Sequence, residues 1–171
     1  MAFRAVSLHE ERLYISRYDP AIGLVEDHDA WKDAGYPKDY AKFFVFREGE
    51  SPTIFYLKPL SGHLANEIQD RFTAVNIGND KKKNDDSAIK MNSNGQNWEA
   101  TRHALKRVEN FLDENGVAME LTFQDLSSNI RVVREDCMVR MFSRMNRNVA
   151  FEIGNFVLSE NTLSRQEQKN S

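Results

Sequence analysis

The sequence predicts a single α+β domain over residues 1–171, in which antiparallel β-hairpins pack against about four α-helices. Runs rich in aromatic and β-branched residues, typical of half-buried strands, lie close together at 43–46 and 53–57. Apolar residues at helical spacing follow them, first from Leu64 and again from Trp98. Because regular crossover helices do not separate the strands, a parallel doubly wound sheet is not expected.

Composition and length limit the class of protein. The 171 residues carry a formal net charge of −3 spread over many acidic and basic side chains, whereas a general nucleic-acid binder would be clearly basic. The lone Cys137 excludes an internal disulfide and fits a reducing compartment. No apolar run reaches the roughly 20 residues of a membrane helix, and Met1–Leu8 is too short and polar for a signal peptide. We therefore expect a soluble intracellular protein that binds neither membranes nor nucleic acid.

Residues 1–42 are expected to form an extended N-terminal arm or long loop. Apolar and charged positions near its start follow no clean period, and Asp19–Pro20 is typical of a turn. The segment that follows has a loop-like composition, with Trp31, Tyr36 and Tyr40 as aromatic anchors on the rest of the domain.

Residues 43–77 are expected to form a hairpin and a helix. The connection at 47–52 carries Gly and Pro, which favours a hairpin with a longer loop. Pro59 ends the second strand because it has no N–H, and Ser61 caps the helix that follows. A single apolar stripe predicts that this helix lies across the hairpin. The stripe consists of Leu64, Ile68, Phe72 and Val75.

Residues 78–97 are polar, charged and nearly free of large apolar side chains. Such a segment cannot bury enough apolar surface to offset the entropy of ordering it. We therefore expect a mobile loop here.

Residues 98–160 are expected to hold the remaining regular structure. Helical spacing runs from Trp98 through Leu112, and Asn115–Gly116 ends this helix because glycine adopts the left-handed conformation easily. Alternating apolar residues then predict a half-buried strand at Val117–Phe123.

The C-terminal part continues with a turn, a strand and two helices. The turn is expected at 124–129, the strand at 130–133, and the helices at 134–142 and 149–159. Residues 161–171 form a tail, in which Ser164–Glu167 has the spacing of a capping box and starts a frayed helical turn.

The sequence shows no catalytic or cofactor-binding pattern. It has no glycine-rich phosphate loop, no supported pair of catalytic carboxylates and no zinc-type spacing of cysteine and histidine. Glu26–Asp29 is the densest group of metal-ligand side chains, but its spacing matches no calcium loop, so a solvated acidic loop is expected. Cys137 is expected to be a small apolar residue on a helix face. The histidines expected at the surface are His9, His28, His63 and His103. We therefore expect no enzyme activity, no metal and no cofactor.

The C-terminal third carries the candidate partner-binding residues. Arginine is versatile at interfaces, so a basic series here predicts a protein-binding face rather than a nucleic-acid face. The series is Arg131, Arg134, Arg140, Arg144 and Arg147. Nearby methionines are expected mainly to fill the core, with an adaptable binding surface as the alternative. These are Met138, Met141 and Met145.

Three segments carry a family resemblance. The first joins Met1–Leu8 to Ser16–Ala21, and the second leads from Trp98 through Val108 to Leu112–Gly116. The third joins Val149–Asn155 to the segment 160–170, with its Asn-x-Leu-Ser motif and its Lys-Asn end. Together they resemble small phage-encoded proteins of the tail and head–tail module, most of all tail assembly chaperones.

The resemblance implies a non-enzymatic protein that acts in virion assembly. A chaperone of this type would bind the long tape-measure protein and keep its helices from aggregating. That role requires an apolar or adaptable groove with a polar rim, which is expected on the last two helices. The apolar residues expected there are Met138, Met141, Met145, Phe151 and Phe156, with Arg140 and Arg144 beside them.

Two other functions stay open. A structural virion component, such as a minor tail or connector protein, would order its arm and polar loop against neighbouring subunits. A phage inhibitor would instead bind one host defence protein tightly. In each case the partners are proteins, self-association stays open, and the chain acts in the host cytoplasm or within the virion.

Overall fold

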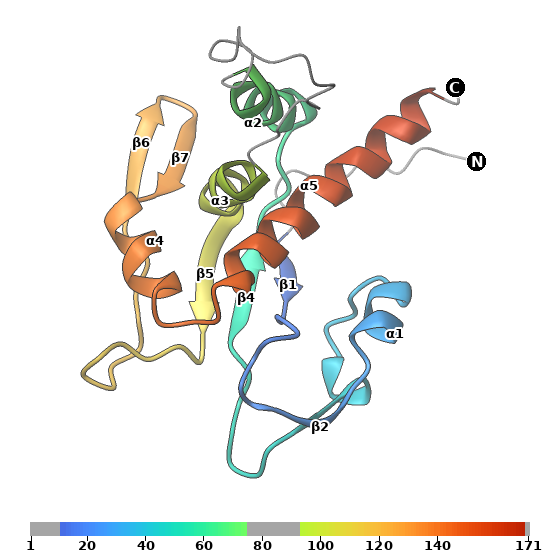
Figure 1. Ribbon diagram of the computed structural model, residues 1–171, viewed down its shortest axis with the longest axis vertical. Coiled ribbons are helices and arrows are strands. Elements are labelled where there is room, and N and C mark those ends of the chain that lie inside the picture. Colours follow the sequence, from blue (N-terminus) through green and yellow to red (C-terminus); the bar gives the residue numbers. More distant parts are fainter. Residues whose placement is uncertain (1–10, 75–92, 170–171) are drawn as a thin grey trace, which may run out of the picture.

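The computed structural model describes residues 11–74 and 93–169, and it confirms the α+β class. In this part of the chain, helices and small antiparallel sheets follow one another along the sequence (Figure 1). The strands are β1 (Arg12–Tyr14), β2 (Ile22–Glu26), β3 (Phe44–Phe46), β4 (Ile54–Leu57), β5 (Leu105–Glu109), β6 (Phe123–Ser127) and β7 (Ile130–Val133). The helices are α1 (His28–Asp33), α2 (Gly62–Ala74), α3 (Ser93–Ala104), α4 (Glu135–Phe142) and α5 (Asn148–Lys169), with a short 3-10 helix at Tyr40–Lys42.

A three-stranded antiparallel sheet with the order β1-β4-β5 lies at the centre. In the middle strand, Phe55 pairs with Tyr14 of β1 on one side and with Val108 of β5 on the other. Phe55 and Leu57 are almost fully buried, and the ring of Phe55 stacks on that of Phe142 in α4 with their centroids 6.2 Å apart. The aromatic and β-branched composition of β4 thus produces the strand that it predicts.

The predicted hairpin of 43–46 with 53–57 is wrong, although both strands exist. β3 pairs with β2, whereas β4 pairs with β1 and β5. The buried carboxylate of Asp19 accepts hydrogen bonds from the backbone N–H of Thr53 at 2.7 Å and of Ala21 at 2.8 Å. This anchor fixes the start of β4 beside the β1–β2 connection, so that β4 continues along β1.

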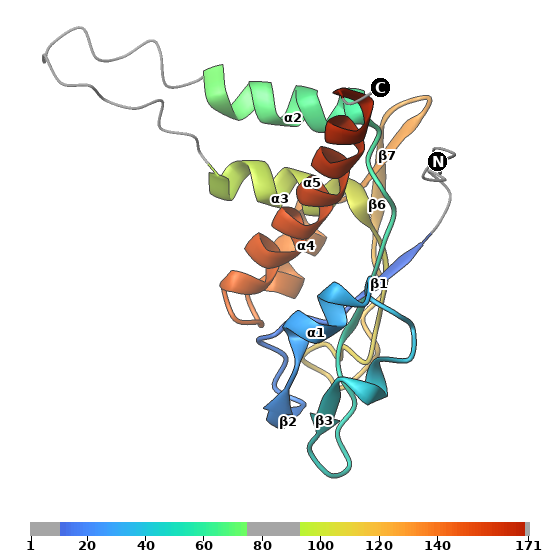
Figure 2. The same ribbon diagram turned by 90° about the vertical axis from the view of Figure 1, so that its right-hand side faces the viewer.

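Helices α2, α3 and α5 lie on one side of the strand layer (Figure 2). As predicted, the Ser61 hydroxyl caps α2 by accepting a hydrogen bond from the Leu64 N–H at 3.2 Å. The described part of the apolar stripe of α2, with Ile68 fully buried, packs on α3 and α5 rather than across a hairpin; Val75 and the rest of the segment 75–77 lie outside the described residues. The stripe therefore identifies the buried face of the helix but not the element that covers it.

The described part of the expected arm, residues 11–42, is folded rather than extended. It contains β1, β2 and α1, and Trp31 of α1 is fully buried. The ring of Trp31 lies 5.0 Å from that of Tyr36 and 5.3 Å from that of Phe44, and its indole N–H donates to the Pro37 carbonyl at 3.0 Å. This aromatic cluster supplies the burial that orders a segment of otherwise loop-like composition.

A β-bulge explains why the helix expected over 98–112 ends early. The structure has α3 up to Ala104 and then strand β5. The pairing with β4 shifts between Leu105 and Arg107, so Lys106 is an extra residue in the strand. Leu105 and Val108 therefore both point inward while the two residues between them point outward. Their i, i+3 spacing imitates a helix.

The strand expected at 117–123 and the turn expected at 124–129 are both displaced. Only an isolated bridge, between Leu112 and Ala118, precedes Phe123, because the Asp113 carboxylate accepts from the Asn115 and Val117 amides and holds a tight turn. β6 then runs through most of the expected turn. Its side chains are largely exposed, so it has no apolar pattern to reveal it.

The C-terminal elements agree better with the sequence. Strand β7 and helix α4 are confirmed, and Cys137 is a buried residue of α4. Helix α5 is longer than the predicted 149–159, since it continues through the capping-box segment to Lys169. Residues 93–97 of the expected mobile loop belong to the start of α3, where Gln96 and Asn97 are buried and Asn97 lies against Gly154 of α5; residues 78–92 lie outside the described residues.

Candidate partner-binding groove

A groove with a volume of about 670 Å³ lies between α3, α4 and the start of α5. Side chains from all three helices line it. These residues are distant in sequence and meet because α3 packs closely on α5. The lining residues are Asn94, Trp98, Val139, Phe142, Ser143, Arg147, Asn148, Ala150 and Phe151.

The floor of the groove is apolar and open to solvent. Val139 is 52% exposed and Phe151 is 43% exposed, so the lining presents two large apolar side chains to solvent. The indole of Trp98 meets the ring of Phe142, another lining residue, edge to face at 5.7 Å. An apolar ligand surface in contact with this floor would remove the floor from water. Such burial of apolar surface is the main source of binding free energy in sites of this kind.

The rim is polar and carries a single sign of charge. Asn94, Ser143 and Asn148 are neutral, and Arg147 is the charged lining residue. Within the described residues Arg147 forms no ion pair, and no carboxylate lines the groove. The groove therefore favours an apolar ligand that also presents a negative charge.

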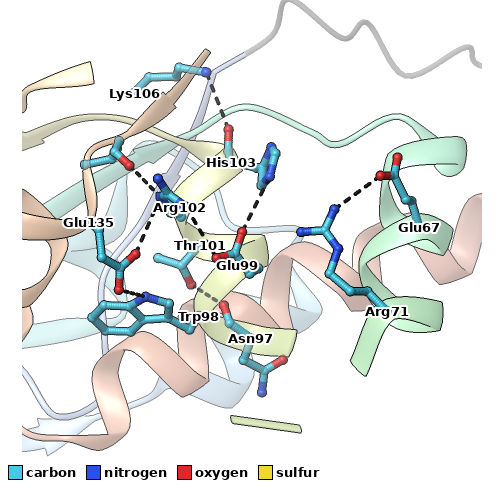
Figure 3. A network of polar contacts seen from close by, with 11 residues as sticks. Glu67, Arg71, Asn97, Trp98, Glu99, Thr101, Arg102, His103, Lys106 and Glu135 are labelled. Carbon is cyan, nitrogen blue, oxygen red and sulfur yellow. Dashed lines mark hydrogen bonds and ion pairs between the residues drawn. The ribbon is translucent and has the colours of Figure 1, made fainter. Parts of the chain in front are cut away.

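A polar network fixes Trp98 in the wall of the groove (Figure 3). The indole N–H donates to the Glu135 carboxylate at 3.0 Å, and the other oxygen of Glu135 lies 3.7 Å from the Arg102 guanidinium. Arg102 in turn donates to the backbone carbonyl of Val133 at 2.7 Å. Because α3, α4 and β7 each contribute a member, the network locks the rotamer of an aromatic side chain that the ligand would contact.

The same network continues to a buried histidine on α3. The Glu99 carboxylate lies 3.5 Å from Arg102 and 3.7 Å from the His103 ring, as Figure 3 shows. Burial, assisted by the neighbouring cations Arg102, Arg71 and Lys106, lowers the pKa of His103 to about 4. His103 is therefore neutral at pH 7, and the expectation of a surface histidine is wrong at this position.

Phe151 is the residue of the predicted partner-binding set that lines the groove. Met138 and Met141 are fully buried and Phe156 is 6% exposed, so all three belong to the core, and Met145 is half-buried against it. Arg140 pairs with Asp113 at 3.3 Å and Glu114 at 3.0 Å, and Arg144 pairs with Glu114 at 3.2 Å; these pairs tie the 110–122 loop to α4.

Sequence reasoning missed Trp98, Val139 and Phe142 as lining residues. Val139 and Phe142 lie at i and i+3 and so share one side of α4. Trp98 carries no such signal, because it comes from a helix distant in sequence.

Histidine, carboxylate and hydroxyl groups meet elsewhere, around Glu152 of α5. The Ser16 hydroxyl donates to this carboxylate, Arg17 pairs with it at 3.3 Å, and the buried His28 lies 3.8 Å from it. A hydrolytic triad needs the imidazole between hydroxyl and carboxylate, whereas here the carboxylate lies between the other two. The cluster ties α5 to the β1–β2 connection, and it shows that His28 is not part of a solvated loop; Asp27 beside it caps α1.

Other classes of site have no counterpart in residues 11–74 and 93–169. No group of three or more His, Cys, Asp or Glu side chains in these residues is arranged to hold a metal ion. None of the helices described there combines the length and the apolar character needed to span a membrane. In comparisons with family models, curated proteins and solved structures, no match to the chain was found.

Proposed function

We propose that this chain is a non-enzymatic phage protein of virion assembly, a tail assembly chaperone that holds an amphipathic helix of another phage protein in the α3–α4–α5 groove. The exposed apolar floor, with a polar rim around it, is the observation that carries the proposal. The lining combines residues of the last two helices, to which the resemblance assigns a groove, with Asn94 and Trp98 of α3.

The chemistry of the groove defines the ligand further. An amphipathic helix presents a stripe of apolar side chains at i, i+3 and i+4, which fits the apolar side chains that three helices contribute to the groove. Arg147 selects a helix that carries Glu or Asp beside this stripe, because an opposite charge there acquires a partner on binding. A tape-measure protein, made of long helices that need cover before assembly, is the ligand that the resemblance implies.

The decisive experiment measures binding of the source phage's tape-measure protein to Val139→Glu. A carboxylate placed in the apolar floor should weaken binding by about tenfold or more, as expected for a central interface residue. Val45→Glu is the matched control, because Val45 is 55% exposed and belongs to β3, away from the groove. Equal weakening by both variants, or by neither, would contradict the groove as the binding site.

A charge reversal tests the selection by Arg147. Arg147→Glu should weaken binding of the tape-measure protein, while Arg47→Glu, which reverses an exposed arginine outside the groove, should not.

The chaperone function itself is tested by quantitative mass spectrometry of purified particles. A chaperone is absent from particles and abundant in infected cells, whereas a fixed copy number in particles would make the chain a structural virion component.

A further inference from the structure

The turn at 113–117, on the loop between β5 and β6, contains an exposed Asn-Gly pair (Figure 1). Asn115 and Gly116 belong to no helix or strand, and residues 114–118 are all exposed. Gly116 has a φ of +73°, and no heavy atom of the described residues, apart from its chain neighbours, lies within 4 Å of the place where a Cβ would stand. Water therefore reaches the peptide bond between the two residues.

The side-chain amide of an asparagine is chemically labile, above all before a glycine, which has no Cβ to obstruct the backbone nitrogen. In this reaction the glycine nitrogen loses its proton and attacks the asparagine Cγ, and the new N–C bond closes a cyclic imide. The bond from Cγ to the amide nitrogen breaks, and this nitrogen leaves with the proton as ammonia. Water then opens the imide to aspartate or, by attack at the main-chain carbonyl, to isoaspartate.

Hydrogen bonds fix the backbone of the turn but not the side chain of Asn115. The Asp113 carboxylate accepts from the N–H groups of Asn115 at 2.8 Å and Val117 at 3.0 Å. The Gly116 N–H donates to the Asp113 carbonyl at 3.1 Å, and this bond has to open before the nitrogen attacks. Opening an exposed turn costs little free energy compared with unfolding. Within the described residues the Asn115 side chain forms no hydrogen bond, so nothing there holds it away from the nitrogen.

A second Asn-Gly pair, Asn94–Gly95, lies in a very different setting. It belongs to α3, and the next two residues, Gln96 and Asn97, are buried, with Asn97 against Gly154 of α5. To bring the Gly95 nitrogen to the Asn94 Cγ, the backbone has to rotate away from the helical ψ of about −42°. Packing of α3 on α5 resists that rotation, so the helix protects this pair.

We propose that Asn115 is a site of spontaneous deamidation in the folded protein, whereas the fold protects Asn94. The reacting groups of the two pairs are the same, so the difference in reactivity comes from the structure around them. Water is the only co-reactant, and ammonia is the leaving group. The proposal is independent of the groove and of the chaperone function.

Isoaspartate at residue 115 should loosen the attachment of the loop to α4. It inserts an extra carbon into the main chain between Asp113 and Val117, where the Asp113 N–H donates to the Val117 carbonyl at 2.7 Å. The Asp113 carboxylate also pairs with Arg140 of α4 at 3.3 Å. A turn distorted by the extra carbon therefore disturbs the ion pair that ties the loop to the helix.

The test follows deamidation of the full chain in mildly alkaline buffer by mass spectrometry of proteolytic peptides. In the folded protein the peptide with Asn115 should convert at least about tenfold faster than the peptide with Asn94. In urea the two rates should approach each other, because the helix that protects Asn94 is lost. Asn115→Gln should abolish conversion at this site, since glutamine would need a larger ring, and should leave the rate at Asn94 unchanged.

Three results would overturn the proposal. They are equal rates at the two sites in the folded protein, faster conversion at Asn94, and an Asn115 that reacts in urea but not in the folded chain.

Hydrogen exchange tests the expected loosening of the loop. The Met119 N–H donates to the Phe111 carbonyl at 2.9 Å just beyond the turn, and it should exchange about tenfold faster in chains with isoaspartate. Asn115→Asp is the matched control, because it adds the carboxylate without the extra main-chain carbon, and it should exchange like wild type. Exchange at the wild-type rate in the isoaspartate chains would show that the loop stays attached, and the structural consequence would be wrong.

Discussion

Helices α3 and α5 contact each other in two contrasting ways. Around Gly154 they are so close that a Cβ added to this glycine would lie 2.5 Å from the Cα of Asn97 and closer still to its carbonyl oxygen. One residue farther along α3, Trp98 lines the open groove, together with Phe151 of α5. The same pair of helices thus forms both a very close backbone contact and one wall of the candidate site.

Side-chain size accounts for the difference. On the closed side small residues allow the backbones to approach, and the Thr101 hydroxyl donates to the Ala150 carbonyl of the other helix at 3.0 Å. On the open side the aromatic rings of Trp98, Phe142 and Phe151 line the groove between α3, α4 and α5. A rigid closed side holds the open side in a fixed shape, which reduces the ordering cost of binding.

The largest effect is expected where the closed side is broken. Gly154→Ala should destabilise the fold by roughly 2 kcal/mol or more, because backbone rather than a flexible side chain occupies the space of the new Cβ. The better helix propensity of alanine offsets only about 1 kcal/mol. In a chain of this size the midpoint of thermal unfolding should fall by about 4–8 °C.

Gly62→Ala is the matched control, since Gly62 begins α2 and has open space around its Cα. It should leave the thermal midpoint unchanged or slightly raised. A midpoint for Gly154→Ala equal to that of the control would show that the two helices can separate without cost, and the proposed rigidity would be wrong.

The burial of His103 on α3 should also make the fold sensitive to acid. Its pKa of about 4 in the folded state is below the value near 6.5 expected for the unfolded chain. The unfolded chain therefore binds more protons between these values, so the stabilisation is complete above about pH 6.5 and is lost as the pH falls toward 4. Between pH 7 and pH 5 wild type should lose about 2 kcal/mol more than His103→Gln in urea unfolding.

Because other groups titrate in the same pH range, the comparison is between wild type and variant in how the free energy of unfolding changes with pH, rather than in its absolute value. His63→Gln provides the control because His63 is exposed on α2. Its stability should follow wild type at each pH. A His103→Gln profile parallel to wild type would mean that this histidine takes up its proton in the folded protein.

Local chemistry explains which elements could be predicted. Helix α2 could be predicted from the Ser61 cap and the apolar stripe, and strand β4 from the aromatic run at 54–57. Each of these signals lies within or next to the element that it predicts. The pairing of β4 could not be predicted, because it depends on the Asp19 carboxylate, far away in sequence. The bulge at Lys106 misled the prediction, since two outward residues between two inward ones repeat the spacing of a helix.

The candidate site shows the same limit. The helices that form most of the groove were expected, but Met138 and Met141 point into the core and Val139 points out of it. On a short helix with apolar residues on several sides, composition alone does not distinguish these directions. Trp98 joins the site only because Gly154 permits α3 to lie against α5, a contact that no local pattern encodes.

The smallest effect on stability is expected on the open side, at the support of Trp98. Glu135→Ala removes the acceptor of the indole N–H, but Glu135 is 56% exposed, so the free energy of unfolding should fall by only about 0.5–1 kcal/mol.

The orientation of Trp98 should change more than the stability does. Acrylamide quenching measures this, because Trp31 is fully buried and serves as an internal reference. Quenching should increase for Glu135→Ala but not for Asp136→Ala, which removes a neighbouring carboxylate from the same helical turn. If both variants quench like wild type, packing against Phe142 holds the indole by itself, and the Glu135 network is not what shapes the groove.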